Sequence, residues 1–280
     1  MDGIIIINKE KNYTSNDVVN IVKKITKSKV GHTGTLDPNA TGVLPLLIGN
    51  ATKVSKYLIN HDKEYEVVLQ LGIRTETADV EGKVIEQKEV TAEMLNKDNI
   101  EEKLQQFIGK QEQIPPIYSA IKVNGKKLYE YAREGKSVTL PKRDVSIIDL
   151  KLLSVTPTTF TFKTIVSKGC YIRSMIEDMG KILGVPLTMA SLKRTKQGDF
   201  SLTDAKNLAE IDENVELISI KDALQVKTRE IDKDLAKKIK SGSKIRIDEN
   251  MLLFLEDGKE LALYMKIDDY AKPLKMFNTK

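Results

Sequence analysis

Gly31-His32-Thr33-Gly34-Thr35-Leu36-Asp37-Pro38-Asn39-Ala40-Thr41-Gly42 places three glycines, a proline, a carboxylate and one of the chain's two histidines in twelve consecutive positions. Neither a helix nor a strand favours that composition. Glycine supplies backbone conformations with φ > 0, and Pro38 pushes the residue before it toward an extended conformation. The stretch therefore predicts a shaped loop that holds Asp37 and His32 at defined angles, and such loops on rigid scaffolds are common places for catalytic groups.

The same residues also have ordinary interpretations. An aspartate before proline often begins a turn with a solvated carboxylate, and most aspartates lie on the surface. A loop histidine is often bonded to a backbone carbonyl. The stretch is not a phosphate-binding P-loop, because the pattern Gly-x-x-x-x-Gly-Lys-Ser/Thr is absent. The residues of this stretch alone leave the roles of Asp37 and His32 open.

The bulk composition is that of an ordinary water-soluble globular protein, with 30% charged and 40% hydrophobic residues in 280. The apolar run Ile4–Ile7 is far too short for a signal peptide or a membrane span, so we expect a cytoplasmic protein without membrane contact. Cys170 is the single cysteine, which excludes an internal disulfide and a zinc ribbon. With only His32 and His61 besides, we expect no metal site.

The net charge of +5 is modest, so any surface for nucleic acid must be a patch that folding creates. The tract from Lys122 to Arg143 is the best local candidate, because tyrosines are interleaved with its basic residues. A solvated helix with tyrosines against the core is the alternative, and the residues leave both open. The tract contains Lys122, Lys126, Lys127, Tyr129, Tyr131, Arg133, Lys136, Lys142 and Arg143.

Hydrophobic periodicity predicts strands at residues 3–7, 65–71 and 160–166. Together with capping residues, it also predicts three helices. Thr14 or Ser15 begins a helix with a buried face from Val18 to Ile25. Asp98 and Glu101 resemble a capping box at the start of a helix that ends at Gly109. A helix also follows Gly169 and stops at Gly184.

Strands and helices do not alternate as regular βαβ units, so the pattern favours an α+β fold around a mixed, mainly antiparallel sheet. We place a domain boundary near residues 225–231, which gives domains at 1–225 and 226–280. The second contains short apolar runs between turn signals, typical of a small β-rich domain or a β-barrel cap. These runs are Ile245–Ile247, Met251–Leu255, Leu261–Tyr264 and Pro273–Phe277.

The stretch Gly31–Pro38, with Ala40–Pro45 after it, resembles the active-site motif of the tRNA pseudouridine synthase B (TruB) family. Further blocks agree with that family in order and spacing over about the first 200 residues. One departure is Glu10, because the family usually has proline after the lysine that is Lys9 here. The agreeing blocks are Gly3–Lys9, Thr14–Asp17, Lys63–Tyr65, Leu71–Asp79, Gln113–Lys122, Gly125–Arg133, Ser167–Arg173 and Leu192–Arg194.

The resemblance implies a pseudouridine synthase core at 1–225, with a basic RNA-contacting insertion at 122–147. It also implies that residues 226–280 form a PUA-like RNA-binding domain. The implied reaction isomerises uridine to pseudouridine in the T-loop of tRNA (U55). The enzyme would bind the T-arm stem-loop, flip the target base, and need no cofactor and no metal. The sequence leaves no apolar surface stripe over, so we expect a monomer.

The resemblance also implies roles for single residues. Asp37 is the nucleophile, with attack at C1′ or at C6 left open, and Arg173 is its ion-pair partner. The Tyr65 ring stacks on the flipped uracil and its hydroxyl serves as a base or an orienting group, and His32 fills the gap that the extruded nucleotides leave. Lys9 supports the catalytic loop or meets a phosphate. The remaining implied contacts to substrate or RNA are Tyr171 and Leu192, as walls of the pocket, and Lys122, Lys126, Lys127 and Arg133.

Three other functions compete with this one. A non-catalytic RNA-binding protein that kept the scaffold would not need Asp37. A glycoside hydrolase also attacks an anomeric carbon with a carboxylate, but it generally needs a second acid nearby. Asp79 is the nearest family-like acid in sequence. A synthase that acts in a guide-RNA complex usually carries longer extensions than this chain has.

Overall fold

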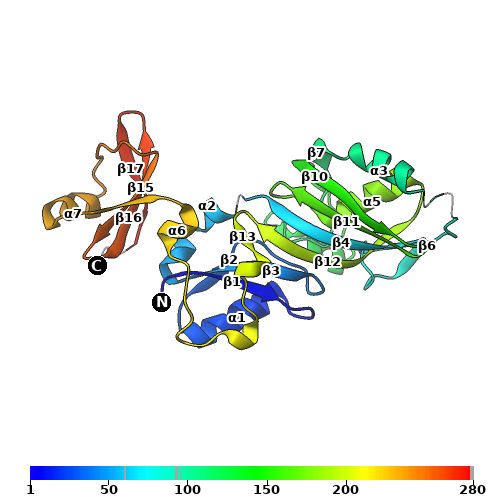
Figure 1. The fold of residues 1–280 in the computed structure, drawn as a ribbon, viewed down its shortest axis with the longest axis horizontal. Coiled ribbons are helices and arrows are strands. Elements are labelled where there is room, and N and C mark those ends of the chain that lie inside the picture. Colours follow the sequence, from blue (N-terminus) through cyan, green and yellow to red (C-terminus); the bar gives the residue numbers. More distant parts are fainter. Residues whose placement is uncertain (60, 92–93, 95, 278–280) are drawn as a thin grey trace.

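The computed structural model of the protein describes residues 1–59, 61–91, 94 and 96–277 (Figure 1). Its strands are β1 Gly3–Lys9, β2 Val30–His32, β3 Thr41–Ile48, β4 Lys63–Leu71, β5 Ile73–Thr75, β6 Val84–Gln87, β7 Gly109–Gln113, β8 Lys122–Val123, β9 Lys126–Lys127, β10 Arg143–Val155, β11 Thr159–Val166, β12 Leu187–Gln197, β13 Phe200–Ser201, β14 Lys227–Glu230, β15 Met251–Glu256, β16 Lys259–Ile267 and β17 Tyr270–Met276. Its α-helices are α1 Ser15–Thr26, α2 Ser55–Leu58, α3 Lys97–Gln105, α4 Leu128–Arg133, α5 Ile172–Leu183, α6 Ile220–Leu224 and α7 Lys233–Lys240.

The larger sheet runs in the order β1-β3-β12-β4-β11-β10-β7, with β2 paired to β3 and β13 paired to β12. Every strand pair in it is antiparallel except β3 and β12, which are parallel. The expected mixed, mainly antiparallel α+β architecture is therefore confirmed. The predicted strands at 3–7, 65–71 and 160–166 lie within β1, β4 and β11.

Helices α1, α3 and α5 share one hydrophobic core with the larger sheet. In α1 the Thr14 side chain accepts a hydrogen bond from the Asp17 amide, and the Asp17 carboxylate accepts one from the Thr14 amide. This capping box confirms the predicted start of the helix. Helix α5 ends at Gly184, whose φ of 70° is the left-handed conformation that glycine favours.

The predicted cap of α3 is wrong. Asn96, and not Asp98, accepts a hydrogen bond from the Asn99 amide at 3.0 Å. Both residue types cap helices well, so the sequence offers two possible starts, and the chain uses the earlier one. Asp98 instead lies in the first turn, where the helix dipole favours a carboxylate.

The C-terminal strands form a separate sheet in the order β14-β15-β16-β17, which lies at the far end of the molecule from α3 in Figure 1. Helix α7 packs against this sheet in a core of its own. A further cluster joins Leu253 and Leu263 of this sheet to Ile4 and Val43 of the larger one. The predicted strand at 245–247 is wrong, because only Ile245 forms a single bridge, to Ala271.

The 31–42 stretch is anchored at both ends by sheet structure. His32 still belongs to β2, and Thr41 already belongs to β3, so the irregular part covers residues 33–40. Gly42 has a φ of 101°, and a Cβ there would collide with the backbone carbonyl of Arg194 on β12. Glycine at this position therefore lets β12 run beside β3 and close the loop against the sheet.

Candidate active site

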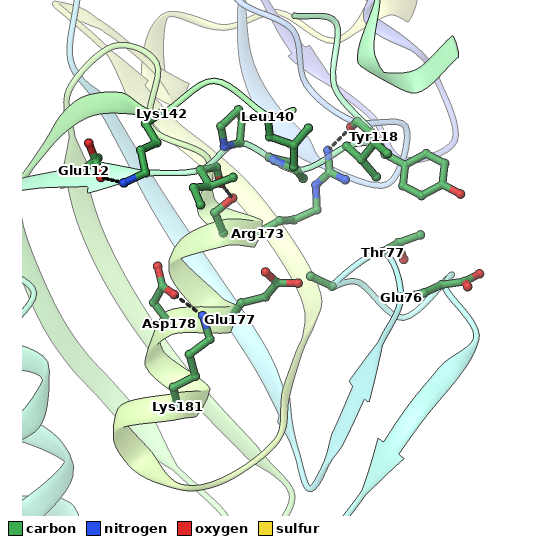
Figure 2. A pocket seen from close by; sticks show the side chains of 16 residues that line it. Glu76, Thr77, Glu112, Tyr118, Leu140, Lys142, Arg173, Glu177, Asp178 and Lys181 are labelled. Atoms are coloured by element: carbon green, nitrogen blue, oxygen red, sulfur yellow. Dashed lines mark hydrogen bonds and ion pairs between the residues drawn. The ribbon is translucent and has the colours of Figure 1, made fainter. Parts of the chain in front are cut away.

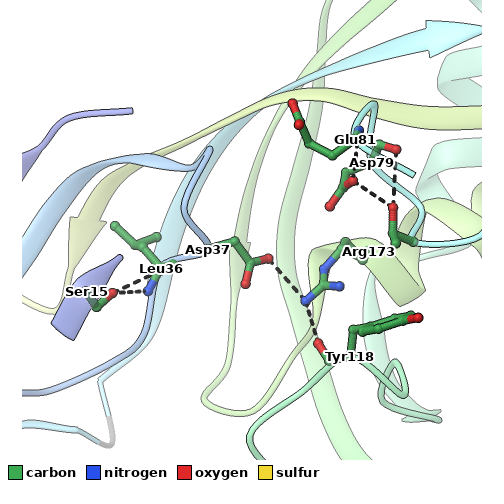
Figure 3. Close-up of polar contacts among 8 residues, drawn as sticks. Ser15, Leu36, Asp37, Asp79, Glu81, Tyr118 and Arg173 are labelled. Atoms are coloured by element: carbon green, nitrogen blue, oxygen red, sulfur yellow. Dashed lines mark hydrogen bonds and ion pairs between the residues drawn. The ribbon is translucent and has the colours of Figure 1, made fainter. Parts of the chain in front are cut away.

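Asp37 is held by hydrogen bonds to the residues on either side of it. The Ser15 hydroxyl accepts from the Leu36 amide at 2.8 Å and donates to the Leu36 carbonyl at 3.0 Å. The Lys9 Nζ donates to the Pro38 carbonyl at 3.0 Å. These contacts fix the backbone around Asp37, while its side chain stays 40% exposed (Figure 3). The loop therefore presents a carboxylate on a rigid support.

Lys9 is fully buried and supports the loop from beneath. Besides Pro38, its Nζ donates to the carbonyls of Glu10 and Tyr13. Burial lowers the pKa of Lys9 to about 8, and the nearby Asp37 carboxylate opposes that shift. All three acceptors are backbone groups, so Lys9 supports the loop and has no free access to a phosphate. Glu10, in place of proline, leaves this anchor intact.

Arg173 forms the ion pair that the sequence predicts. It lies in the first turn of α5, and its Nη2 is 3.1 Å from the Asp37 Oδ2 and donates to the Tyr118 carbonyl at 3.0 Å (Figure 3). The Arg173 side chain is only 9% exposed. A cation near a helix N-terminus is disfavoured by the helix dipole, and these two acceptors offset that cost. The pair orients the Asp37 carboxylate.

A cavity of about 500 Å³ opens beside this ion pair. The Asp37 loop forms one wall, strands β4 and β12 form another, and the start of α5 forms a third. Tyrosine rings contribute from β4 (Tyr65) and from the start of α5 (Tyr171), which suits a flat ligand. The cavity residues used below are Asp37, Lys63, Tyr65, Tyr129, Tyr171, Leu192 and Arg194.

The predicted residues Tyr65, Tyr171 and Leu192 all line this cavity. Tyr65 is buried on β4, directly opposite Arg194 in the register of β12 and β4. Burial raises the pKa of the Tyr65 hydroxyl, and the positive charge of Arg194 opposes that rise. Burial also raises the pKa of Tyr171. Both side chains are therefore neutral rings with a polar tip at the cavity.

His32 does not line the cavity. It lies on β2 opposite Leu46, and its Nδ1 is buried without a hydrogen-bond partner among the described residues. Burial, together with the Arg194 charge, lowers the pKa of His32, so the ring is neutral at pH 7. The alternative of a Nδ1 bonded to a backbone carbonyl is not what the structure shows. His32 thus presents a partly buried neutral ring next to the catalytic loop.

The 122–147 tract forms a small arm made of the β8–β9 hairpin and helix α4, and its last residues already belong to β10. Lys127 and Arg133 stack over the ring of Tyr129 at 5.2 and 5.3 Å, and Tyr129 lines the cavity. Lys126 lies 5.0 Å from the Tyr131 ring and pairs with Glu134. Lys122 is exposed on β8. The arm therefore connects basic side chains directly to the cavity wall.

Sequence reasoning missed three polar residues around this cavity, two of them completely buried and the third, Lys63, half-buried. Arg194 is completely buried, and its Nε donates to the Val43 carbonyl at 2.7 Å. Gln197 is also completely buried and donates to the Thr33 hydroxyl at 2.6 Å. Lys63 lines the cavity, and its Nζ donates to the His61 carbonyl at 2.8 Å. The three residues lie at the polar ends of β4 and β12, where the sequence pattern predicts half-exposed strand positions.

A second cavity, of about 450 Å³, shares Arg173 and Tyr118 with the lining of the first (Figure 2). Four carboxylates line it, and two of them pair with lysines: Glu112 with Lys142 at 2.6 Å, and Asp178 with Lys181 at 2.7 Å. Glu76 and Glu177 add further negative charge. The cationic side chains in its lining, Lys142, Lys181 and Arg173, are each already paired with a carboxylate, so this cavity offers no excess positive charge to a phosphate. This contrast favours the cavity at Asp37 as the site for a nucleotide.

Asp37 contributes the only carboxylate among the described residues that line the first cavity. The Asp79 carboxylate is used in its own turn, where it accepts from the Thr77 hydroxyl at 2.7 Å and the Glu81 amide at 3.1 Å (Figure 3). A glycoside hydrolase needs a second acid on the other side of the scissile bond. The arrangement therefore argues against that reaction.

The residues that the structure describes contain no group of three or more His, Cys, Asp or Glu side chains arranged to hold a metal ion. In the same residues, no helix has the length and apolar character needed to cross a membrane.

Comparison with known proteins places the chain in one family. The family model described as "TruB family pseudouridylate synthase (N terminal domain)" matches residues 22–172. The chain is 43% identical to tRNA pseudouridine synthase B of Oceanobacillus iheyensis, over 99% of this chain and 98% of that protein. It is 40% identical to the protein of the same name in Staphylococcus aureus (strain MSSA476), over 99% of both.

A solved structure shows the same fold at lower identity. The crystal structure of a Cbf5-Nop10-Gar1 complex contains a chain that matches with a TM-score of 0.70 and 23% identity, over 99% of this chain and 85% of that one. This likeness confirms the expected pseudouridine synthase fold of the core. The chain is therefore a member of the TruB family of pseudouridylate synthases, which are isomerases.

Proposed function

We propose that this protein converts the T-loop uridine of tRNA (U55) to pseudouridine. The observation that carries the proposal is the Asp37–Arg173 pair at the mouth of a cavity that holds no second carboxylate among its described residues. Its relatives in O. iheyensis and S. aureus are named for action on tRNA, and the match covers nearly the full length of each. This supports tRNA as the substrate.

The proposed reaction breaks the bond between uracil N1 and ribose C1′, turns the base, and rejoins it through C5. The proton on C5 is released, and N1 gains one, so the atoms balance without an added reactant. Asp37 is the nucleophile in this proposal. Attack at C1′ and attack at C6 give the same product, and both require the nucleotide beside the Asp37 carboxylate. Arg173 keeps that carboxylate aimed at the cavity.

The target uridine must leave its stack to reach Asp37, which costs about a few kcal/mol. Tyr65 and Tyr171 offer rings in the cavity that can recover this cost by stacking. We assign to His32 the space that the extruded nucleotides vacate, because its neutral ring lies next to the loop but outside the cavity. The enzyme would thus recognise the shape of a hairpin loop and its extruded bases.

We propose that two parts of the chain contact the RNA outside the cavity. The arm at 122–147 holds the T-arm through Lys122, Lys126, Lys127 and Arg133. Residues 226–280, with their own sheet and core, act as a PUA-like domain that adds RNA contacts outside the catalytic domain 1–225. We further propose that the protein acts as a monomer in the cytoplasm, where its substrate is found.

A synthase working in a guide-RNA complex is the second candidate. The likeness to the Cbf5 chain supports the shared fold, but this chain covers 85% of that protein and 98–99% of its tRNA-modifying relatives. The lengths therefore favour an enzyme that binds tRNA directly. A guide-dependent enzyme would modify no T-arm hairpin by itself, which separates the two candidates.

The test uses purified protein and three unmodified RNAs: the T-arm hairpin, full-length tRNA and an anticodon-arm hairpin of equal length. We expect pseudouridine at the T-loop uridine of the first two RNAs and none in the third, as mapped by chemical probing and mass spectrometry. Modification of the anticodon arm at a similar rate would contradict the assignment to the T-loop. Modification of tRNA but not of its hairpin would limit the substrate to the whole tRNA.

Replacing Lys127 or Arg133 with glutamine should weaken RNA binding with little effect on kcat at saturating RNA. Each side chain stacks on Tyr129 at the cavity wall, where it can reach a phosphate. Removing one phosphate contact lowers the slope of log K against log salt by about one. Kd measured by fluorescence anisotropy over a salt series checks this. Lys181 is an exposed lysine on α5, outside the arm. Lys181→Gln is therefore the control and should leave the slope unchanged.

Lys63 should make RNA binding depend on pH. Burial, followed by the charge of Arg194, lowers the pKa of Lys63 to about 8, so its charge is present below that pH and lost above it. A bound phosphate favours the charged form, and therefore the affinity falls as pH rises through about 8. The fall in affinity across this pH range, measured as Kd, should correspond to the loss of one proton and should be absent in Lys63→Met. A loss of equal size in Lys63→Met would exclude Lys63 as its source.

A further inference from the structure

We propose that Arg194 is a positioning residue for the reaction, which holds both ends of the catalytic loop and fixes the Tyr65 hydroxyl so that its proton faces the substrate. The proposal rests on the proposed function in one respect, namely that Tyr65 contacts the flipped uracil. The proposal gives this side chain, which is buried away from solvent, a task in catalysis beyond stabilising the fold.

Arg194 clamps the loop at two points. Its Nη2 donates to the Gly34 carbonyl at 3.1 Å, three residues before Asp37, and its Nε donates to the Val43 carbonyl at 2.7 Å, beyond the loop's far end. At Gly34 even a Cβ would lie 3.3 Å from the guanidinium, so the backbone itself rests against Arg194. The distance between the loop's two ends is thus set by one rigid, planar group.

Arg194 also faces Tyr65 across the sheet. The two residues are directly paired in the antiparallel register of β12 and β4, and both are buried. A guanidinium can only donate hydrogen bonds. In a hydrogen bond between these paired side chains, Arg194 is therefore the donor and the Tyr65 hydroxyl the acceptor. The hydroxyl proton is then left to point toward another acceptor, which in this cavity is the bound base.

The charge of Arg194 is the third part of the argument. Among the described residues, Asp37 forms its ion pair with Arg173, whereas Arg194 forms no ion pair and donates to two backbone carbonyls. A buried cation paired only with neutral groups favours negative charge nearby. It opposes the effect of burial on the Tyr65 pKa, and it would stabilise negative charge that develops on the base during transfer.

Gln197 provides a matched control. It is buried on the same strand and anchors the same loop, through the Thr33 hydroxyl at 2.6 Å. Its recorded hydrogen bonds do not involve Tyr65. A residue that only stabilises the loop should behave like Gln197. A residue that acts through Tyr65 should not.

The experiment measures kcat on T-arm RNA for Arg194→Met, Gln197→Met and Tyr65→Phe, and for each of the first two combined with Tyr65→Phe. We expect Arg194→Met to lower kcat by about 10²-fold, since misplacing a catalytic group by about 1 Å has that effect. In the Tyr65→Phe background the loss should shrink several-fold, because the two residues act together. The loss from Gln197→Met should be the same in both backgrounds.

A pH profile of kcat gives a second measurement. Tyr65→Phe should remove one limb of this profile. In Arg194→Met the same limb should move to higher pH, because the tyrosine loses its neighbouring cation, and in Gln197→Met it should stay in place. Thermal melting and Kd for RNA confirm that each variant is folded. If Arg194→Met does not fold, Arg194→Lys is used in the same cycle, since lysine keeps the charge without the planar set of donors.

Equal losses from Arg194 substitution with and without Tyr65, together with an unmoved pH limb, would overturn the proposal and leave Arg194 a structural residue. Failure of the proposed function gives a different result, because the unsubstituted enzyme would then leave the T-loop uridine unmodified. The two failures are therefore distinguishable in one series of assays.

Discussion

Asp37→Asn should abolish turnover while RNA binding is retained. The substitution keeps the size and the position of the side chain but replaces the nucleophilic carboxylate by a neutral amide, so kcat should fall by at least about 10⁴-fold. The loop itself should persist, because Lys9 and Ser15 hold backbone groups of Pro38 and Leu36 and not the Asp37 side chain. Single-turnover assays and anisotropy titrations on the same RNA measure the two effects separately.

Asp79→Asn is the matched control for this experiment. Asp79 lies in a neighbouring turn, where its carboxylate is bonded to Thr77 and Glu81. Its replacement should change kcat no more than an ordinary surface substitution does. If Asp37→Asn kept more than a few percent of the activity, Asp37 would not be the nucleophile. If it lost RNA binding as well, the loop would be a binding element rather than a catalytic one.

Arg173→Met should give the second-largest loss, a fall in kcat of about 10²- to 10³-fold. The substitution removes the partner of Asp37 and leaves the Tyr118 carbonyl without its donor. Methionine keeps much of the length and packing of the side chain, so the effect reports the charge and its hydrogen bonds. Arg173→Lys should recover only part of the activity, because a lysine cannot reproduce the planar donor geometry.

Lys181→Met tests whether this loss is specific to the ion pair. Lys181 lies on the same helix, and its partner is the exposed Asp178. Exposed pairs of this kind contribute about 0–1 kcal/mol, so kcat and the melting temperature should scarcely change. A kcat for Arg173→Met within a few-fold of the unsubstituted enzyme would show that Asp37 is oriented without Arg173.

The parts of the fold that the sequence predicted share a strong local signal. Strands β1, β4 and β11 carry either a continuous apolar run or strict alternation, and α5 combines an apolar face with Gly184 at its end. The composition of the 31–42 stretch also predicted the irregular loop that carries Asp37. The Asp37–Arg173 pair was predicted from the family resemblance, and the structure places the Arg173 Nη2 3.1 Å from the Asp37 Oδ2.

What the sequence did not predict depends on contacts between distant segments. Register shifts in β12 between Met189 and Ser191 and between Arg194 and Lys196 change which residues face inward. Strict alternation therefore fails to identify Arg194 and Gln197 as buried. The parallel pairing of β12 with β3 joins segments about 150 residues apart and depends on Gly42. At Asn96 and Asp98 two good caps compete, and only tertiary packing decides between them.

The most direct test of the central claim follows the C5 proton of the target uridine. T-arm hairpin RNA with tritium on C5 of its T-loop uridine is incubated with the purified protein, without added metal or nucleotide, and release of tritium to water is counted. The account predicts release that approaches one tritium per hairpin, with pseudouridine at that position. RNA that binds tightly but retains its tritium would contradict it, and would point to a protein that binds this hairpin without modifying it.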